Sequence, residues 1–154
     1  MEVLIQNLKK NNLKVTPQRL VIYSFLSGNR SHPSAEEVHR GITPLNPTIS
    51  LATVYKTLSS LKTANLIQEI NVGEDSSRYD IQVEPHAHLI CSNCNSITDY
   101  FPDHALKNFT DEAKSVIGQN AKFEINYSQI YFYGICCNCS APSLSNFKNL
   151  NNII

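Results

Sequence analysis

Four cysteines in two C-x-x-C pairs are the residues of this sequence most typical of metal binding. Cys91 and Cys94 form the first pair, CSNC, and Cys136 and Cys139 form the second, CCNC. Two such pairs can supply the four thiolates of a tetrahedral zinc site, because each pair forms a tight turn whose sulfurs converge. Redox-active dithiols are the alternative, but the chain lacks a thioredoxin-like βαβ pattern. We therefore predict a structural zinc ion, with Cys137 as an uninvolved neighbour.

Two histidines and a carboxylate near the first cysteine pair predict a second metal site. If HAHLIC is a strand, His86 and His88 share one face of it, and Cys91 lies on the other. If the chain turns at Ser92–Asn93, the return strand places Asp99 opposite one of the two histidines. Imidazole and carboxylate ligands together suit Fe(II), Mn(II) or Zn(II). The segment is therefore expected to serve two sites, one of sulfur and one of nitrogen and oxygen.

The charge of the chain is divided unevenly between its two ends. Residues 1–64 hold eight Lys/Arg and three Asp/Glu, a balance of 8 − 3 = +5, and the whole chain holds 13 of each, so the remainder has −5. A basic front half is typical of nucleic-acid binding, while the acidic back half holds the Cys and His motifs. Since 154 residues suit one medium domain or two small ones, we expect two parts with different tasks.

No segment of the sequence has the pattern of a targeting or membrane-spanning signal. The opening MEVLIQNLKKNN becomes polar after five residues, and no apolar run approaches the ~20 residues of a membrane helix. We therefore expect a cytoplasmic protein. In that reducing compartment, clustered cysteines are metal ligands more often than disulfides.

Helix start and stop signals follow one another in the front half. Thr16 is predicted to cap a helix that has Pro17 at its first position and ends at Gly28 in the left-handed conformation. Ser34 and Glu37 have the spacing of a capping box, which predicts the start of the next helix. These signals indicate a helical N-terminal part.

A further helix is predicted to begin at Ser50, with an apolar stripe on one face and an unusual composition on the other. The stripe consists of Leu51, Val54, Leu58 and Leu61. The opposite face holds small, hydroxyl-bearing or basic residues with one aromatic ring at its edge: Ala52, Thr53, Lys56, Thr57, Ser60 and Tyr55. Such a face can enter a DNA major groove and meet thymine methyls, base edges and phosphates, although a plain solvated helix is the alternative.

The segments after this helix favour a DNA-binding domain followed by a mixed α/β domain. LIQEINVGEDSSRYDI contains two strand-like runs around a Gly-Glu-Asp turn, and helices followed by a β-hairpin form a winged helix. DHALKNFTDEAKSVIGQN is predicted to be a helix, and AKFEIN and QIYFYGI are expected to supply strands to a sheet shared by two copies. Zinc would add folding free energy to a back domain of ~60 residues, which buries little core alone.

In combination these motifs resemble the ferric uptake regulator (Fur) superfamily over about residues 3–139. The motifs are TPQR (16–19), HPSAEEV (32–38), LATVYKTL (51–58), SRYD (77–80), HAHLICSNC (86–94), ITDY (97–100) and YGICCNC (133–139). Members are dimeric, metal-dependent transcription factors and not enzymes. The resemblance implies an α+β protein with an N-terminal winged helix-turn-helix DNA-binding domain and hinge, 1–84, and a C-terminal α/β dimerisation domain, 85–140. The tail, 141–154, matches nothing and is predicted to be mobile.

The resemblance also implies roles for individual residues. Structural Zn(II) would be held by Cys91, Cys94, Cys136 and Cys139. Regulatory Fe(II) or Mn(II) would be held by His32, Asp80, His86, His88 and Asp99, of which residue types and spacing alone indicate only the last three. Contacts to double-stranded DNA with a palindromic operator are expected from Arg19, Ser50, Ala52, Thr53, Tyr55 and Lys56.

Asp99 makes the chain most similar to the peroxide-sensing, PerR-type branch of the superfamily. Iron-sensing relatives usually have glutamate at this position, and SSRYD also fits the peroxide-sensing pattern. In that branch bound Fe(II) reacts with hydrogen peroxide and two histidine ligands are oxidised, which would be His32 and His86 here. Many iron and zinc sensors have a third metal site, whose neighbourhood is occupied here by residues that ligate weakly or not at all: Pro85, Ala87, Tyr127 and Ser128.

Three alternatives remain open. Sensing of iron, manganese or zinc without peroxide chemistry is the first, because Asp99 carries much of the assignment and Lys56 replaces the asparagine of some peroxide regulators. The second is a non-haem iron oxygenase, which would also use two histidines and a carboxylate, but no apolar substrate pocket is identifiable. A zinc deaminase is not among the three, because the sequence lacks H-x-E and P-C-x-x-C. The third is a purely structural zinc protein, which would bind no exchangeable metal ion and no DNA.

Overall fold

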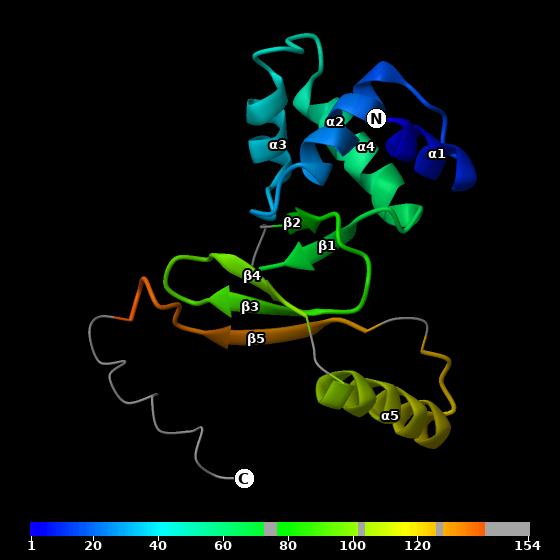
Figure 1. The fold of residues 1–154 in the computed structure, drawn as a ribbon, viewed down its shortest axis with the longest axis vertical. Helices are drawn as coiled ribbons and strands as arrows, with labels where there is room; N and C mark the ends of the chain where they lie inside the picture. The colour runs from blue at the N-terminus through cyan, green and yellow to red at the C-terminus, as the bar shows by residue number, and fades with distance from the viewer. Residues whose placement is uncertain (73–76, 102–103, 126–127, 141–154) are drawn as a thin grey trace. The chain divides into compact units, whose positions relative to one another are not determined.

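The chain divides into two compact units. The computed structural model describes residues 1–72, 77–101, 104–125 and 128–140. The first unit spans Met1–Glu84 and the second Pro85–Ile154 (Figure 1). The Gly-Glu-Asp turn of the expected wing and the tail 141–154 lie outside the described residues.

The first unit consists of four helices followed by a β-hairpin. The helices are α1 (Glu2–Lys10), α2 (Pro17–Ser27), α3 (Ala35–Ile42) and α4 (Leu51–Thr63), and the strands are β1 (Gln68–Asn71) and β2 (Ser77–Asp80). The two strands pair antiparallel, with Gln68 opposite Asp80 and Asn71 opposite Ser77. This element order confirms the winged helix expected from the sequence (Figure 1).

The predicted helix starts are confirmed, because each capping side chain accepts a backbone hydrogen bond. Thr16 accepts from the N–H of Arg19 at 3.3 Å, and Ser50 accepts from that of Thr53 at 3.2 Å. Ser34 and Glu37 form the complete capping box, in which the Glu37 carboxylate also accepts from the Ser34 N–H at 2.8 Å. These hydroxyls satisfy N–H groups that have no partner within the helix.

The predicted left-handed end of α2 is wrong. Gly28 does follow the helix, but its φ is −92° and not positive. The helix closes through a tighter turn, in which the N–H of Asn29 donates to the carbonyl of Leu26 at 3.0 Å, so no left-handed residue is needed. The left-handed residue after α4 is Asn65, with a φ of 52°.

The core of the first unit is built from the apolar stripes of its helices. Its fully buried side chains include Leu8, Ile22, Leu26, Val38, Val54, Leu58, Leu61 and Ile67. The stripe of α4 is confirmed at Val54, Leu58 and Leu61, while Leu51 is partly buried against the same cluster. Because α4 lies with this stripe inward, its remaining residues are held in a constant orientation relative to the other helices.

Truncation of Leu58 tests how strongly this core fixes α4. Leu58 has no exposed surface, so Leu58→Ala is expected to lower the free energy of unfolding by about 2–5 kcal/mol through lost burial and a cavity. Urea unfolding followed by circular dichroism measures the change. Leu45→Ala is the control, since Leu45 is 90% exposed and its truncation should change stability by less than about 0.5 kcal/mol. Equal unfolding midpoints for the two variants would contradict the assignment.

The second unit combines a three-stranded sheet with one long helix. The strands are β3 (Ala87–Cys91), β4 (Ile97–Tyr100) and β5 (Ile130–Gly134), and the helix α5 (His104–Ala121) lies between β4 and β5 in the chain. The sheet order is β4-β3-β5, with β4 antiparallel and β5 parallel to β3. A parallel neighbour requires a long connection, which here contains α5 (Figure 1).

The strand predicted in AKFEIN is not formed among residues 122–125 of this single chain. The first residues of that segment instead close α5. Lys122 takes a left-handed φ of 50°, and the N–H of Phe123 donates back to the carbonyl of Gly118 at 2.9 Å. This pattern is a helix C-terminal motif, and it occupies the backbone groups that a strand would need. The helix itself and the strand from QIYFYGI are confirmed.

Candidate metal centres

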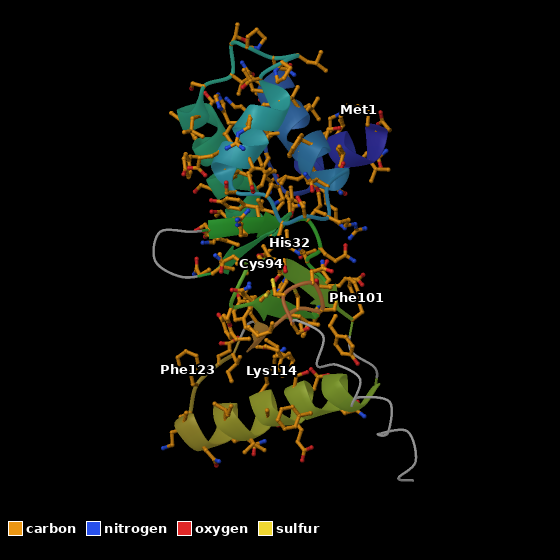
Figure 2. The ribbon with its side chains drawn as sticks, turned by 90° about the vertical axis from the view of Figure 1, so that its left-hand side faces the viewer. Met1, His32, Cys94, Phe101, Lys114 and Phe123 are labelled. Carbon is orange, nitrogen blue, oxygen red and sulfur yellow. The ribbon has the colours of Figure 1, made fainter. Side chains whose placement is uncertain are left out.

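The sheet of the second unit brings the two cysteine pairs to one end. Strand β3 runs parallel to β5 with Cys91 opposite Gly134, so the turn after β3 and the turn after β5 are neighbours. One sulfur from each of Cys91, Cys94, Cys136 and Cys139 lies within 4.8 Å of all the others (Cys94 is labelled in Figure 2). The Cys94 and Cys136 sulfurs are 3.7 Å apart, close to the edge of about 3.8 Å expected of a tetrahedron with Zn–S distances of ~2.3 Å.

Hydrogen bonds around Cys91 favour its thiolate. The backbone N–H of Cys136 donates to Cys91 Sγ at 3.3 Å, and together with the N–H groups of Cys94 and Asn93 it lowers the pKa of this thiol to about 6. At Cys139 the Asn93 side chain lowers the pKa, but the neighbouring Cys94 and Cys136 outweigh it and raise the pKa to about 12. Four crowded sulfurs ionise together only when a dication offsets their repulsion, so this donor set fits a zinc ion.

Cys137 lies outside this cluster. Its side chain is exposed, and its thiol is 3.8 Å from the side-chain oxygen of the adjacent Asn138. It does not belong to the group of four sulfurs that converge. This position agrees with the sequence-based interpretation of Cys137 as a neighbour of the ligands.

Two histidines and an aspartate converge in the second unit. Asp99 on β4 lies directly opposite His88 on β3, which is one of the two registers expected from the sequence. Asp99 Oδ1 is 3.4 Å from His86 Nε2 and 3.7 Å from His88 Nε2, and the two Nε2 atoms are 3.0 Å apart. Both imidazoles are buried, with side-chain exposures of 0% and 1%. Three ligand atoms aimed at one point fit a two-histidine, one-carboxylate metal site.

Aromatic rings hold these imidazoles in place. The ring of Phe101 stacks on His86 with centroids 5.2 Å apart, and the ring of Tyr131 stacks on His88 at 5.7 Å. The Tyr131 hydroxyl donates to the side-chain oxygen of Gln129 at 2.7 Å, which fixes the tyrosine in turn. Ligands that are locked before the metal arrives lose little freedom on binding.

The first unit brings together His32 and Asp80, which reasoning from residue types missed. A nitrogen of His32 and a carboxylate oxygen of Asp80 lie within 4.8 Å of each other, and both residues are buried. The N–H of Tyr79 donates to the carbonyl of Pro33 at 3.0 Å, so a backbone hydrogen bond joins the residues next to each. Asp80 Oδ1 also accepts from the N–H of Gln82 at 2.9 Å.

The backbone of His32 is the signal that marks this position. His32 has a φ of 51°, a conformation uncommon for residues other than glycine, and it directly precedes Pro33. Such strained positions occur often at functional sites. No pattern in the sequence indicates this conformation, because the segment is held by a hydrogen bond between Pro33 and Tyr79, which are far apart in the chain.

The predicted DNA-contact residues lie on α4 or at its N-cap, apart from Arg19 on α2, and one other residue of the expected α4 face needs a correction. Ser50, Ala52, Tyr55 and Lys56 are exposed, and Thr53 and Arg19 are partly buried. Thr57, which was predicted on the same face, is only 6% exposed and lies on the core side of the helix. Thr57 follows Val54 by three residues, so the two lie on the same face of the helix. Its polar side chain alone does not indicate this burial.

Of the residues named for a third metal site, Ala87 and Ser128 belong to neither cluster of His, Cys, Asp and Glu ligands found among the described residues. Ala87 is buried within β3 and Ser128 is exposed, while Tyr127 lies outside the described residues. The clusters of candidate ligands found among the described residues draw on the four cysteines and on the histidines and aspartates named above.

Comparisons with known proteins agree on one family. The model of the ferric uptake regulator family matches residues 10–133. The peroxide-responsive repressor PerR of Staphylococcus epidermidis is 32% identical over 140 residues, which cover 90% of this chain and 89% of that protein. Among solved structures, the peroxide stress regulator of Campylobacter jejuni is 35% identical, with a TM-score of 0.65 over 87% of this chain and 96% of its own. The ferric uptake regulator of Helicobacter pylori, described as having three functional metal-binding sites, is 27% identical with a TM-score of 0.72 over 92% of both chains.

Proposed function

Because the chain belongs to the ferric uptake regulator family, we propose that it is a metal-dependent transcriptional repressor that senses hydrogen peroxide. The observation that carries this proposal is the convergence of His86, His88 and Asp99 beside a separate four-cysteine cluster. Relatives that are peroxide-responsive repressors support the regulatory role. The resemblance at Asp99 supports the peroxide-sensing branch. The cysteine cluster would hold structural Zn(II), and the second site Fe(II) or Mn(II).

In this proposal the regulatory site takes ligands from both units. The second unit offers three ligand atoms, and the first offers His32 and Asp80, so each alone leaves an Fe(II) or Mn(II) ion with open positions. Five ligands can act together only in one relative orientation of the units. Metal binding would therefore select that orientation. The size of the shift equals the difference in metal-binding free energy between this orientation and the others.

The selected orientation would determine DNA affinity in a dimer. Family repressors bind DNA, and a two-fold dimer places two recognition helices at a distance that matches the two halves of a palindromic operator. Loss of one metal ligand would leave the two units free to change their relative orientation. The two recognition helices of the dimer would then lose their contacts with DNA phosphates and bases together. We expect the protein to act in the cytoplasm, where its operator lies.

Peroxide would act by removing ligands. When bound, Fe(II) would activate hydrogen peroxide at this site; for each imidazole oxidised, one peroxide oxygen is added to the ring, the other leaves as water, and the imidazole itself gives up the electron pair. His32 and His86 would each accept an oxygen atom on the imidazole and would then bind metal poorly. The Phe101 ring covers one face of His86, so the oxidant would reach that imidazole from the side facing the metal.

Anaerobic loading with Fe(II) followed by a small excess of hydrogen peroxide tests this function. Peptide mass spectrometry is expected to find one added oxygen on His32 and on His86, while fluorescence anisotropy shows loss of DNA binding. Protein loaded with Mn(II) is the control and should keep both histidines and its DNA affinity. Unmodified histidines with DNA binding intact would overturn the peroxide assignment.

Metal sensing without peroxide chemistry is the second candidate. The similarity to the Helicobacter pylori ferric uptake regulator, which has a TM-score of 0.72, favours it. In that case titration of Fe(II), Mn(II) and Zn(II) against DNA affinity would identify the inducer. A non-haem iron oxygenase is a distant third candidate, and turnover of a small organic substrate would be its sign.

A further inference from the structure

The first turn of α3 contacts the recognition helix α4 through one hydrogen bond between side chains. The Tyr55 hydroxyl, on the exposed side of α4, donates to Glu36 Oε1 on α3. Both residues are at the surface, and Tyr55 is 45% exposed. This bond is the largest cause of a lowered Glu36 pKa and of a raised Tyr55 pKa, so the pair is a carboxylate and a neutral phenol at pH 7.

Neighbouring contacts make this turn of α3 a rigid support. Glu37 closes the capping box with Ser34 and also accepts from Arg78 of the hairpin at 2.5 Å. The carbonyl of Pro33 accepts from the N–H of Tyr79 on the same strand. Adjacent glutamates of one helical turn therefore contact two different elements, Glu36 the recognition helix and Glu37 the wing.

A carboxylate beside a DNA-reading helix needs a physical reason. It repels DNA phosphates, so it lowers affinity for every sequence alike. Its place in the first turn of α3 favours the helix, and an improved discrimination between sequences would offset the loss of DNA affinity. The Glu36 carboxylate accepts the hydrogen bond of the Tyr55 hydroxyl. It therefore holds the ring in one position and leaves the hydroxyl proton unable to donate elsewhere. The ring edge, which can contact a thymine methyl, would then be presented without a loss of side-chain freedom on binding.

We propose that Glu36 is a positioning residue for sequence recognition, which holds the Tyr55 ring ready to contact a base. This role rests on the proposed function as a DNA-binding repressor. It predicts opposite effects of Glu36 on affinity and on specificity: removal of the carboxylate strengthens binding to unrelated DNA and weakens the preference for the operator.

The first arm of the test finds the operator and checks the proposed function independently. Wild-type protein with zinc and Mn(II) is used to select duplexes from a random library. An enriched palindrome supports DNA recognition and supplies the probe for the second arm. No enrichment at any Mn(II) concentration would overturn the repressor function and the role of Glu36 with it.

The second arm measures a specificity ratio, which is the Kd for a duplex with one base pair changed divided by the Kd for the selected duplex. Glu36→Ala is expected to lower this ratio about tenfold at one position of each half-site, the size of a lost base contact. Glu36→Gln keeps an acceptor for the tyrosine and should stay within about twofold of wild type. Tyr55→Phe should resemble Glu36→Ala, and the double variant should lose no more than either single variant.

Control variants separate positioning from charge and from folding. Glu2→Ala removes a carboxylate from α1 of the same unit and should leave the specificity ratio unchanged. Circular dichroism melting should keep one cooperative transition in all variants, since Glu2, Glu36 and Tyr55 are all exposed. A Glu36→Ala variant with the wild-type ratio, or a Glu36→Gln variant as unspecific as Glu36→Ala, would overturn the proposal while the selected operator upheld the repressor function.

Discussion

Replacement of Cys94 by serine is expected to abolish zinc binding and the folded state of the second unit. Its sheet has three short strands, and several of its large apolar side chains are exposed, so burial alone stabilises it weakly. Structural zinc contributes about 10–16 kcal/mol of apparent binding free energy in small zinc domains, which is as large as the whole stability of a typical domain. Serine oxygen is a poor zinc ligand beside three thiolates.

Metal analysis and thermal melting measure this outcome. Cys94→Ser should contain no zinc and should lose the cooperative unfolding transition of its second unit. Cys137→Ser is the matched control, because this thiol lies one residue from the cluster and outside it, and the variant should keep one zinc per chain. A Cys94→Ser protein that kept zinc and melted like wild type would show that the cluster is not the zinc site.

His32→Ala is expected to uncouple DNA binding from metal while zinc and the fold remain. The second unit would keep its three converging ligands and so retain weak Mn(II) binding. The first unit would lose one of its two ligands and would no longer be held in the orientation that binds DNA. Mn(II) should then change operator affinity by less than twofold, against roughly 5- to 150-fold in wild type, the usual range of coupling between two sites.

Fluorescence anisotropy with and without Mn(II) measures this coupling, and calorimetry measures metal affinity. His39→Ala is the matched control, since His39 is another histidine of the first unit and its Nε2 contacts the carbonyl of Ile49 at 3.0 Å. It should keep the metal dependence of DNA binding. If His32→Ala bound Mn(II) and operator as tightly as wild type, the hinge model would be wrong.

The sequence by itself determined the features that depend on near neighbours in the chain. Helix starts at Thr16, Ser34 and Ser50 are confirmed, because a capping hydroxyl bonds an N–H only three residues away. The pairing of His88 with Asp99 is likewise confirmed, since the two residues lie on strands joined by a short turn. Each C-x-x-C also forms the local turn predicted for it, whereas the meeting of the two pairs depends on the parallel pairing of β3 with β5.

Only the tertiary structure decided the features that depend on packing between distant segments. His32 and Asp80 meet because a backbone bond joins Pro33 to Tyr79, and neither residue has a local signature. The burial of Thr57 and the bond from Tyr55 to Glu36 depend on how α4 rotates against α3. That rotation is determined by the whole core of the first unit. Contacts of this kind come from the summed packing of many side chains, which no short stretch of sequence contains.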